Sequence, residues 1–354
     1  MALNHDEDEG SVSRRRAIQR ILQVGTSLIG VAAAGGAKSL GQSSPSQAPS
    51  GVAYTKPTIS IIVRDRRSAF WQTVLSGARK AGQDLGVNIT ELGTDSESDA
   101  NSQAGMLETA IASNPSAIVI APVRFGAVSN QIENAARTTK IVGIDSDEES
   151  VAFASSLSTD NIQAGRLAAD VLADAIKRTY ADAEGDVAII TPSIDVASID
   201  ERAKGFKEQV ATRYGALDVV AHKIGDDQSN AGFSIMMDLI SEYPELRGVF
   251  VSDLVMASGA AQALAGKKTN TNGDIINFVG FDADSALVQM LQDGTVAALV
   301  VQDAFRMGYE SVKTALAASR NEHVPTYVDT DASIITKANM NTPRSKELIG
   351  LKIN

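Results

Sequence analysis

The sequence predicts an α/β protein of two doubly wound lobes, each built on an open parallel sheet. Three observations carry this prediction. The chain has 354 residues, enough for about two domains. From Thr58 onward, short aliphatic runs alternate with amphipathic segments, the pattern of repeated βα units. The pattern starts again near Asp186, which indicates two similar lobes.

The first fifty residues are typical of an export signal followed by a tether. Residues 13–20 are basic, and Arg14-Arg15 resembles the twin-arginine signature. An uncharged, moderately hydrophobic segment follows and ends in small residues, as export signals do. The Ser- and Pro-rich residues 42–51 are expected to be a flexible tether. We expect export to the periplasm by the twin-arginine route; the alternatives are a basic amphipathic terminus or an uncleaved membrane anchor.

Seven continuous aliphatic runs are predicted to be strands buried on both faces, as parallel sheets require. They are residues 59–63, 117–120, 141–144, 187–190, 248–251, 278–281 and 298–301. Amphipathic segments lie between them. In the first of these, Phe70, Val74 and Ala78 recur at helical spacing, and Gly86 is expected to end the helix.

Polar residues stand directly after several of these runs. They are Arg64, Asp145, Asp253, Asp282 and Gln302. In open α/β sheets, ligands bind outside the carboxyl ends of the strands, so these side chains are expected to share one polar cleft. An aspartate at such a place is also a common N-cap of the next helix. Asp253 and Asp282 are expected to do both, capping a helix and facing the cleft.

Such a cleft suits a polyhydroxylated ligand. Carboxylates accept hydrogen bonds from neighbouring hydroxyls, and an arginine fork donates to ring or hydroxyl oxygens. Phe70 and Trp71 follow the first strand and would cover the C–H face of a sugar ring, while Arg202 follows the strand that ends at Ile190. The plain alternatives are core packing for the two aromatic residues and a solvated first-turn position for Arg202.

Composition excludes several other classes of function. With 32 basic and 43 acidic residues, the net charge is −11, which argues against a nucleic-acid-binding body, because such a body needs a basic stripe. The chain has no cysteine and only three histidines, which disfavours thiol nucleophiles, Cys- or His-ligated metals and a Ser-His-Asp triad. We expect no metal, no cofactor, no nucleic-acid partner and no enzymatic activity.

Together these pieces resemble type I periplasmic sugar-binding proteins, the ribose/galactose-binding cluster of ABC-transporter receptors. The resemblance covers about residues 58–336. It is carried by Ala69-Phe70-Trp71 with Gly77-Ala78, Ile144-Asp145-Ser146, Ser158-Thr159-Asp160-Asn161 with Gly165, Glu201-Arg202 with Gly205-Phe206, Val279-Gly280-Phe281-Asp282, and Val300-Val301-Gln302-Asp303 with Met307-Gly308-Tyr309. It implies two lobes joined by a hinge of three crossings, near residues 158–160, 302–304 and 328–331. The lobes are then 58–158 plus 303–330 and 159–302 plus 331–342.

We expect eight residues to contact the ligand: Arg64, Phe70, Trp71, Asp145, Arg202, Asp253, Asp282 and Gln302. By the resemblance, the two aromatic residues form a ring wall, the three aspartates accept from hydroxyls, the arginine at 202 donates, and the glutamine contacts the ligand from the hinge side. The sequence departs from the ribose receptors at two of these places: Asp145 is followed by Ser146 instead of arginine, and Asp253 stands in place of asparagine.

Arg64 leaves the charge of the ligand open. It ends a strand and is expected to point into the cleft, where it either pairs with Asp145 or Asp253, or binds an acidic sugar or a phosphate. A neutral pentose, hexose or polyol is favoured over an acidic sugar.

The expected function is capture of a small sugar by a monomer that docks on the membrane permease of an ABC importer. One alternative is a sensing receptor for a chemoreceptor or a histidine kinase. Another is an exported carbohydrate-active enzyme that uses paired carboxylates. A transcription regulator of the same fold is disfavoured, because residues 1–50 show no helix–turn–helix pattern.

Overall fold

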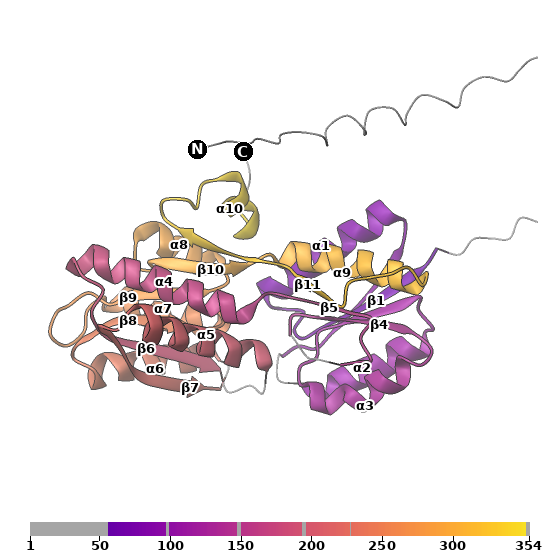
Figure 1. Cartoon of the computed structure of the whole chain (residues 1–354), viewed down its shortest axis with the longest axis horizontal. Helices are drawn as coiled ribbons and strands as arrows, with labels where there is room; N and C mark the ends of the chain where they lie inside the picture. The colour runs from indigo at the N-terminus through magenta and orange to yellow at the C-terminus, as the bar shows by residue number, and fades with distance from the viewer. Residues whose placement is uncertain (1–55, 97–98, 147–149, 193–195, 227, 352–354) are drawn as a thin grey trace, which may run out of the picture. The chain divides into compact units, whose positions relative to one another are not determined.

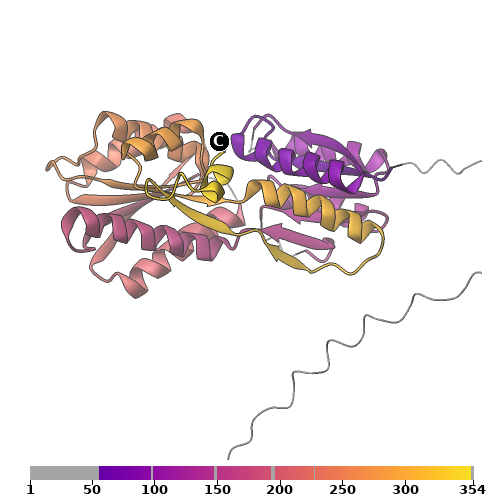
Figure 2. The ribbon, with the colours of Figure 1, turned by 90° about the horizontal axis from the view of Figure 1, so that it is seen from above.

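The computed structural model describes residues 56–96, 99–146, 150–192, 196–226 and 228–351. The predicted export signal and tether, residues 1–50, lie outside these ranges. Residues 54–354 form one compact unit, built on two six-stranded sheets with helices on both faces of each (Figures 1 and 2). None of the helices described is long and apolar enough to cross a membrane.

The first sheet is all parallel, with the strand order β11-β5-β4-β3-β1-β2. Its strands are β1 (Thr58–Val63), β2 (Asn88–Gly93), β3 (Ala117–Ile120), β4 (Lys140–Ile144), β5 (Ser155–Ser158) and β11 (Tyr327–Asp329). Helices α1 (Ala69–Leu85) and α9 (Ala304–Ser319) cover one face, and α2 (Ala100–Ala112) and α3 (Phe125–Ala135) cover the other. In β1, Ile61 packs towards α1 and α9 while Ile62 packs towards α2 and α3, which explains the unbroken apolar run.

The second sheet has the order β12-β10-β9-β8-β6-β7 and is parallel except for β12. Its strands are β6 (Gly185–Pro192), β7 (Leu217–Gly225), β8 (Leu246–Val251), β9 (Asn277–Phe281), β10 (Ala298–Gln302) and β12 (Ala332–Thr336). Helices α4 (Asn161–Tyr180) and α5 (Ala197–Arg213) cover one face; α6 (Ser229–Glu242), α7 (Leu254–Gly266) and α8 (Ser285–Asp293) cover the other. Helix α10 (Pro343–Leu348) follows β12.

The predicted fold class is confirmed, and each of the seven predicted strands is present. The helix predicted from Phe70 is α1, and Gly86 ends it in the left-handed conformation with φ 68°. The structure adds five strands whose sequences lack a continuous apolar run: β2, β5, β7, β11 and β12. Four of them, β2, β7, β11 and β12, are edge strands, and β2 and β7 have exposed positions along their length, so their sequences contain polar residues.

The chain passes from one sheet to the other between β5 and α4, between β10 and α9, and between β11 and β12. Hydrogen bonds tie these crossings together. The backbone N–H of Thr330 donates to the carbonyl of Ser158 at 2.9 Å, and that of Asp160 donates to Oδ1 of Asp329 at 3.3 Å. The crossings therefore bring the carboxyl ends of strands from both sheets to one region.

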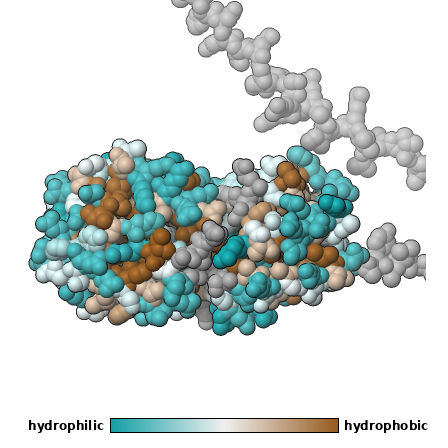
Figure 3. Space-filling model, turned by 90° about the horizontal axis from the view of Figure 1, so that it is seen from below, coloured by the Kyte–Doolittle hydropathy of each residue, from teal (hydrophilic) through white to brown (hydrophobic). Residues whose placement is uncertain are grey.

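The outer surface mixes polar and apolar residues, as Figure 3 shows for the face seen from below. The exposed large apolar side chains on the lobe of the second sheet include Ile224 of β7 and Phe233 and Met237 of α6. Scattered exposure of this kind is normal for a protein surface.

Candidate functional site

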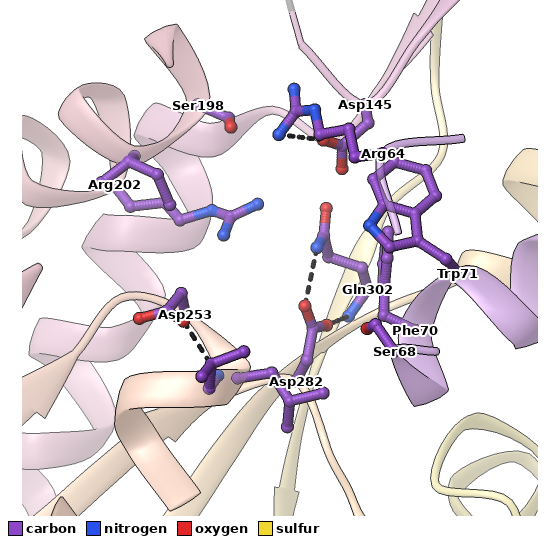
Figure 4. A pocket seen from close by; sticks show the side chains of 13 residues that line it. Arg64, Ser68, Phe70, Trp71, Asp145, Ser198, Arg202, Asp253, Asp282 and Gln302 are labelled. Carbon is purple, nitrogen blue, oxygen red and sulfur yellow. Dashed lines mark hydrogen bonds and ion pairs between the residues drawn. The ribbon is translucent and has the colours of Figure 1, made fainter. Parts of the chain in front are cut away.

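A pocket lies where strands of the two sheets end (Figure 4). About 490 Å³ within it is free of atoms, counting its open mouth. It is lined by Arg64, Ser68, Phe70, Trp71, Asp145, Ser198, Ile199, Arg202, Asp253, Leu254, Val255, Asp282 and Gln302. All eight residues expected from the sequence lie in this lining, and both sheets contribute to it.

Five lining residues were not singled out from the sequence: Ser68, Ser198, Ile199, Leu254 and Val255. They share a location, since each stands at or next to the start of a helix that follows a strand, α1, α5 or α7. That position was the available signal, because helices begin at the same sheet edge where the strands end.

Arg64 and Asp145 form a buried ion pair on the side of the first sheet. Nη1 of Arg64 lies 3.0 Å from Oδ2 of Asp145, and their side chains are 4% and 6% exposed. Nε of Arg64 donates to the carbonyl of Pro122 at 2.9 Å, and Nη2 donates to Oγ of Ser146 at 2.5 Å. Of the two partners considered for Arg64 from the sequence, the structure therefore gives Asp145.

Asp145 and Asp282 occupy equivalent places in the two sheets. Each follows a strand, β4 or β9, and adopts a left-handed backbone with φ 74° or 59°. Each donates its N–H to the neighbouring strand, Asp145 to Leu157 at 2.9 Å and Asp282 to Val300 at 2.8 Å. Aspartate tolerates this conformation better than most residues, so the turn away from the strand is compatible with a carboxylate.

The carboxylate of Asp282 is oriented by Gln302. The backbone N–H of Gln302 donates to Oδ1 at 3.0 Å, and Nε2 donates to Oδ2 at 2.9 Å. The expectation that Asp282 caps a helix is wrong: Asp284 is the N-cap of α8 and accepts from the N–H of Leu287 at 2.7 Å. Asp282 lies two residues before the cap, so its carboxylate is directed to Gln302 instead of to the helix.

Asp253 does cap a helix and also lines the pocket. Its Oδ2 accepts from the N–H groups of Val255 at 2.8 Å and Met256 at 3.2 Å, at the start of α7. Two free N–H groups at a helix start stabilise a carboxylate, which fixes the orientation of this side chain.

Arg202 is buried, not solvated, and it lies in the second turn of α5. Its Nε donates to Oδ1 of Asn161 at 2.8 Å, and its Nη1 donates to the carbonyl of Ser252 at 3.0 Å. Its guanidinium carbon lies 3.8 Å from the ring centroid of Phe281. With two sides held in this way, the free end of the guanidinium points into the pocket (Figure 4).

Phe70 and Trp71 form one wall. Their rings meet edge to face with centroids 4.9 Å apart, and Trp71 is 1% exposed. Trp71 belongs to the core beneath α1 and also lines the pocket, so core packing and a pocket wall are not exclusive alternatives.

The charges of the pocket act on one another. Burial lowers the pKa of Arg202, and the carboxylates of Asp282, Asp145 and Asp253 oppose this shift. Burial raises the pKa of Asp282, and the nearby Arg202 and the two bonds from Gln302 oppose it in turn. Within the described residues, no group of three or more His, Asp or Glu side chains is arranged to hold a metal.

This arrangement can bind a ligand rich in hydroxyls. The hydrogen bonds of Arg202 within the described residues use Nε and Nη1, which leaves Nη2 for a ligand. Oε1 of Gln302 is buried without a donor among the described residues. The pocket therefore offers a guanidinium donor and a buried amide acceptor beside carboxylates and an aromatic wall, the combination expected for a sugar ring.

Comparison with known proteins gives one family. Residues 59–323 match the family model described as a periplasmic binding protein domain. Among relatives, the ribose import binding protein of Escherichia coli is 26% identical over 287 residues, which cover 80% of this chain and 92% of that protein.

Solved structures of high similarity are sugar-transport proteins. A carbohydrate transporter solute binding protein of Agrobacterium radiobacter, in complex with D-arabinose, is 48% identical with a TM-score of 0.79, covering 84% of this chain and 100% of that chain. An ABC transporter solute binding protein of Agrobacterium vitis, bound to α-D-tagatopyranose, is 26% identical with a TM-score of 0.75. The match covers 83% of this chain and 99% of that chain.

Proposed function

Since the chain belongs to the periplasmic binding protein family, we propose that it is a receptor that captures a small neutral sugar and delivers it to an ABC importer. The observation that carries this proposal is the convergence of three aspartates, two arginines, a glutamine and an aromatic wall in one buried pocket. No reacting group is required for this function; the chain supplies affinity and the importer supplies the energy.

In this proposal seven of the eight residues expected from the sequence share the contacts to one sugar, and Arg64 holds Asp145 in place. Asp145, Asp253 and Asp282 accept from hydroxyls, because ionised carboxylates have lone pairs beyond those their protein partners use. Nη2 of Arg202 donates to a ring or hydroxyl oxygen, and Oε1 of Gln302 accepts. Phe70 and Trp71 cover the apolar face of the ring.

The size of the ligand is proposed from the relatives. The structure that is 48% identical holds D-arabinose, and a more distant one holds α-D-tagatopyranose; both ligands are monosaccharides. A pentose or hexose is therefore proposed here, with D-arabinose as the first sugar to test.

The two lobes are proposed to close on the ligand. We take residues 58–158 plus 303–330 as one lobe and 159–302 plus 331–342 as the other, with the three crossings as the hinge. Because the sugar would contact Asp145 on the first sheet and Asp282 on the second, binding would favour the closed arrangement. The closed pair of lobes would then be what the permease recognises.

The site favours binding over hydrolysis. A glycoside hydrolase needs one carboxylic acid that protonates the leaving oxygen and one carboxylate beside it. Here Asp282 has a raised pKa, but both of its oxygens accept hydrogen bonds from Gln302, which holds the group as an acceptor. The relatives include a ribose import binding protein and a carbohydrate transporter solute binding protein, in agreement with a receptor.

The relatives are periplasmic binding proteins, and a periplasmic location follows for this chain. Export by the twin-arginine route and a monomeric state are proposals. Replacing Arg14 and Arg15 together by lysine should leave the precursor in the cytoplasm, measured by fractionation; unchanged export would contradict the route and leave the binding function untouched.

The proposed function is tested by thermal melting of the purified chain with a panel of sugars and polyols, D-arabinose included. A ligand present at 100 times its Kd stabilises the folded state by about 2.7 kcal/mol, which is a readily measured shift. We expect at least one neutral pentose or hexose to raise the melting temperature. A broad panel without any shift would contradict a sugar receptor.

A further inference from the structure

We propose that Arg64 and Asp145 form an internal ion pair that sets the charge specificity of the pocket: Asp145 occupies the guanidinium that would otherwise bind an acidic sugar. Removing the charge of Asp145 should then turn the pocket towards sugar acids. This inference rests on the proposed function, since it concerns which sugars the same pocket accepts.

The first step is the engagement of Arg64. A guanidinium has five N–H groups in a fixed plane. In Arg64, each of the three nitrogens has a partner: Nε donates to Pro122, Nη2 to Ser146, and Nη1 lies 3.0 Å from Oδ2 of Asp145. With side chains 4% and 6% exposed, the pair is closed from solvent. Arg64 is therefore held as a partner for Asp145 and is not presented to the ligand.

The second step is the charge of the whole lining. The charged lining residues are Arg64, Asp145, Arg202, Asp253 and Asp282. Two cations and three carboxylates give a formal charge of −1. Burial lowers the pKa of Arg202, the carboxylates of Asp282, Asp145 and Asp253 oppose this shift, and the charge of Arg64 adds to it, so these groups interact electrostatically. A ligand carboxylate would add negative charge to a buried region that already has an excess of it, which is costly at low dielectric.

The third step is what Asp145→Asn would change. Asparagine has nearly the same shape and still accepts a hydrogen bond, but the formal charge of the lining becomes zero. Arg64 then remains buried without an ionised partner, which is unfavourable, and a ligand carboxylate would restore the pairing. The pocket should therefore lose affinity for a neutral sugar and gain affinity for its acidic analogue.

Asp253→Asn is the matched control. It makes the same change of charge in the same lining, but Oδ2 of Asp253 caps α7 through Val255 and Met256 on the second sheet. If total charge alone decided specificity, the two variants would behave alike. If the Arg64–Asp145 pair decides it, only Asp145→Asn should gain affinity for the acid.

The experiment is calorimetric titration of the full chain with D-galactose and D-galacturonate, which differ only in a carboxylate in place of the CH2OH group. D-arabinose is the reference for sugar binding. For the wild-type chain we expect galacturonate to bind at least 100-fold more weakly than galactose. In Asp145→Asn, the ratio of acid to neutral affinity should rise at least 100-fold, and in Asp253→Asn less than 10-fold. Melting curves show whether each variant is folded. If Asp145→Asn does not fold, Asp145→Ser is used in its place.

The double variant Arg64→Met with Asp145→Asn identifies the cation. It keeps the neutral asparagine but removes the guanidinium, so the gain for galacturonate should disappear. A gain that persists in the double variant, equal shifts in the two single variants, or tight wild-type binding of galacturonate would each overturn the inference. Failure of every neutral and acidic sugar to bind the wild-type chain would instead contradict the proposed function.

Discussion

At the residue scale, the site depends on how Asp282 is held. The sequence predicted an acceptor at this strand end, and the structure places it in the pocket lining. What the sequence did not predict is the contact to Gln302, twenty residues later, because the pairing of β9 with β10 decides it. The helix cap was wrongly assigned to Asp282 because two aspartates lie two residues apart. Only the backbone geometry determines that Asp284 is the cap.

Asp282→Asn should weaken binding of the panel sugar by about 10- to 150-fold, since a hydrogen bond to a charged group contributes about 1.5–3 kcal/mol. Asparagine tolerates the left-handed backbone, with φ 59° here, so the fold should be kept. Calorimetry measures the affinity, and melting checks the fold. Asp284→Asn is the control, because asparagine caps helices as well as aspartate does. Affinity within threefold of wild type in Asp282→Asn would remove this residue from the site.

The raised pKa of Asp282 predicts opposite responses to acid in stability and binding. Burial makes the folded pKa higher than the unfolded one. Between these two values, the folded state binds more protons, so this group stabilises the unliganded fold as pH falls. Sugar affinity should fall over the same range, because a protonated carboxyl loses acceptor capacity. Thermal melting measures the stability, and calorimetric titration measures the sugar affinity, both from pH 7.5 to 4.5. For each quantity, the value for Asp282→Asn is subtracted from that for the wild-type chain. Differences that do not change with pH would contradict a raised pKa of Asp282.

At the element scale, close helix crossings position the site. An added Cβ at Gly205 would lie 2.0 Å from the carbonyl oxygen of Ile162, and one at Gly165 would lie 2.1 Å from that of Arg202. These glycines let α4 and α5 approach closely, which places Arg202 beside Asn161. The sequence contained both glycines within the family-like motifs, but their role follows only from the crossing of two helices.

Gly205→Ala should therefore destabilise the fold by about 1–3 kcal/mol, the usual cost of overpacking, and should weaken sugar binding by displacing Arg202. Gly105→Ala in α2 is the control: nothing lies within 4 Å of its added Cβ, so a small gain in stability is expected. Denaturant unfolding and calorimetry measure the two effects. Equal stabilities of the two variants would show that the α4–α5 crossing is not as tight as described.

The sequence predicted the seven buried strands but not the edge strands. The seven buried strands have apolar residues on both faces, and their sequences are unambiguous. Edge strands such as β7, with half-buried and exposed positions, and the three-residue β11 depend on a neighbouring strand for their formation. Their sequences carry no comparable signal, because long-range pairing supplies the hydrogen bonds that define them.

At the scale of the whole molecule, the two sheets repeat one plan. Their strand orders correspond position by position, with β4 and β5 matching β9 and β10, apart from the antiparallel β12. The restart of the pattern near Asp186 predicted the repetition. It did not predict how the ends of the two sheets meet, which the three crossings determine. A pocket lined by both sheets suits a ligand that holds two lobes together.

Closure of the lobes is expected to be visible in solution. Saturation with the panel sugar should reduce the radius of gyration measured by small-angle X-ray scattering, because contacts to both lobes favour the closed state. The same sugar concentration lies below the Kd of Asp282→Asn, so the radius of gyration of this variant should stay unchanged. An unchanged radius of gyration in the saturated wild-type chain would contradict hinge closure while leaving sugar binding intact.

The most direct test of the central claim is a crystal structure of the chain with the neutral sugar that binds most tightly in the panel. We predict one sugar ring against Phe70 and Trp71, with hydroxyls bonded to Asp145 from the first sheet and to Asp282 and Arg202 from the second. A sugar bound elsewhere, or held by residues of one sheet alone, would contradict the account.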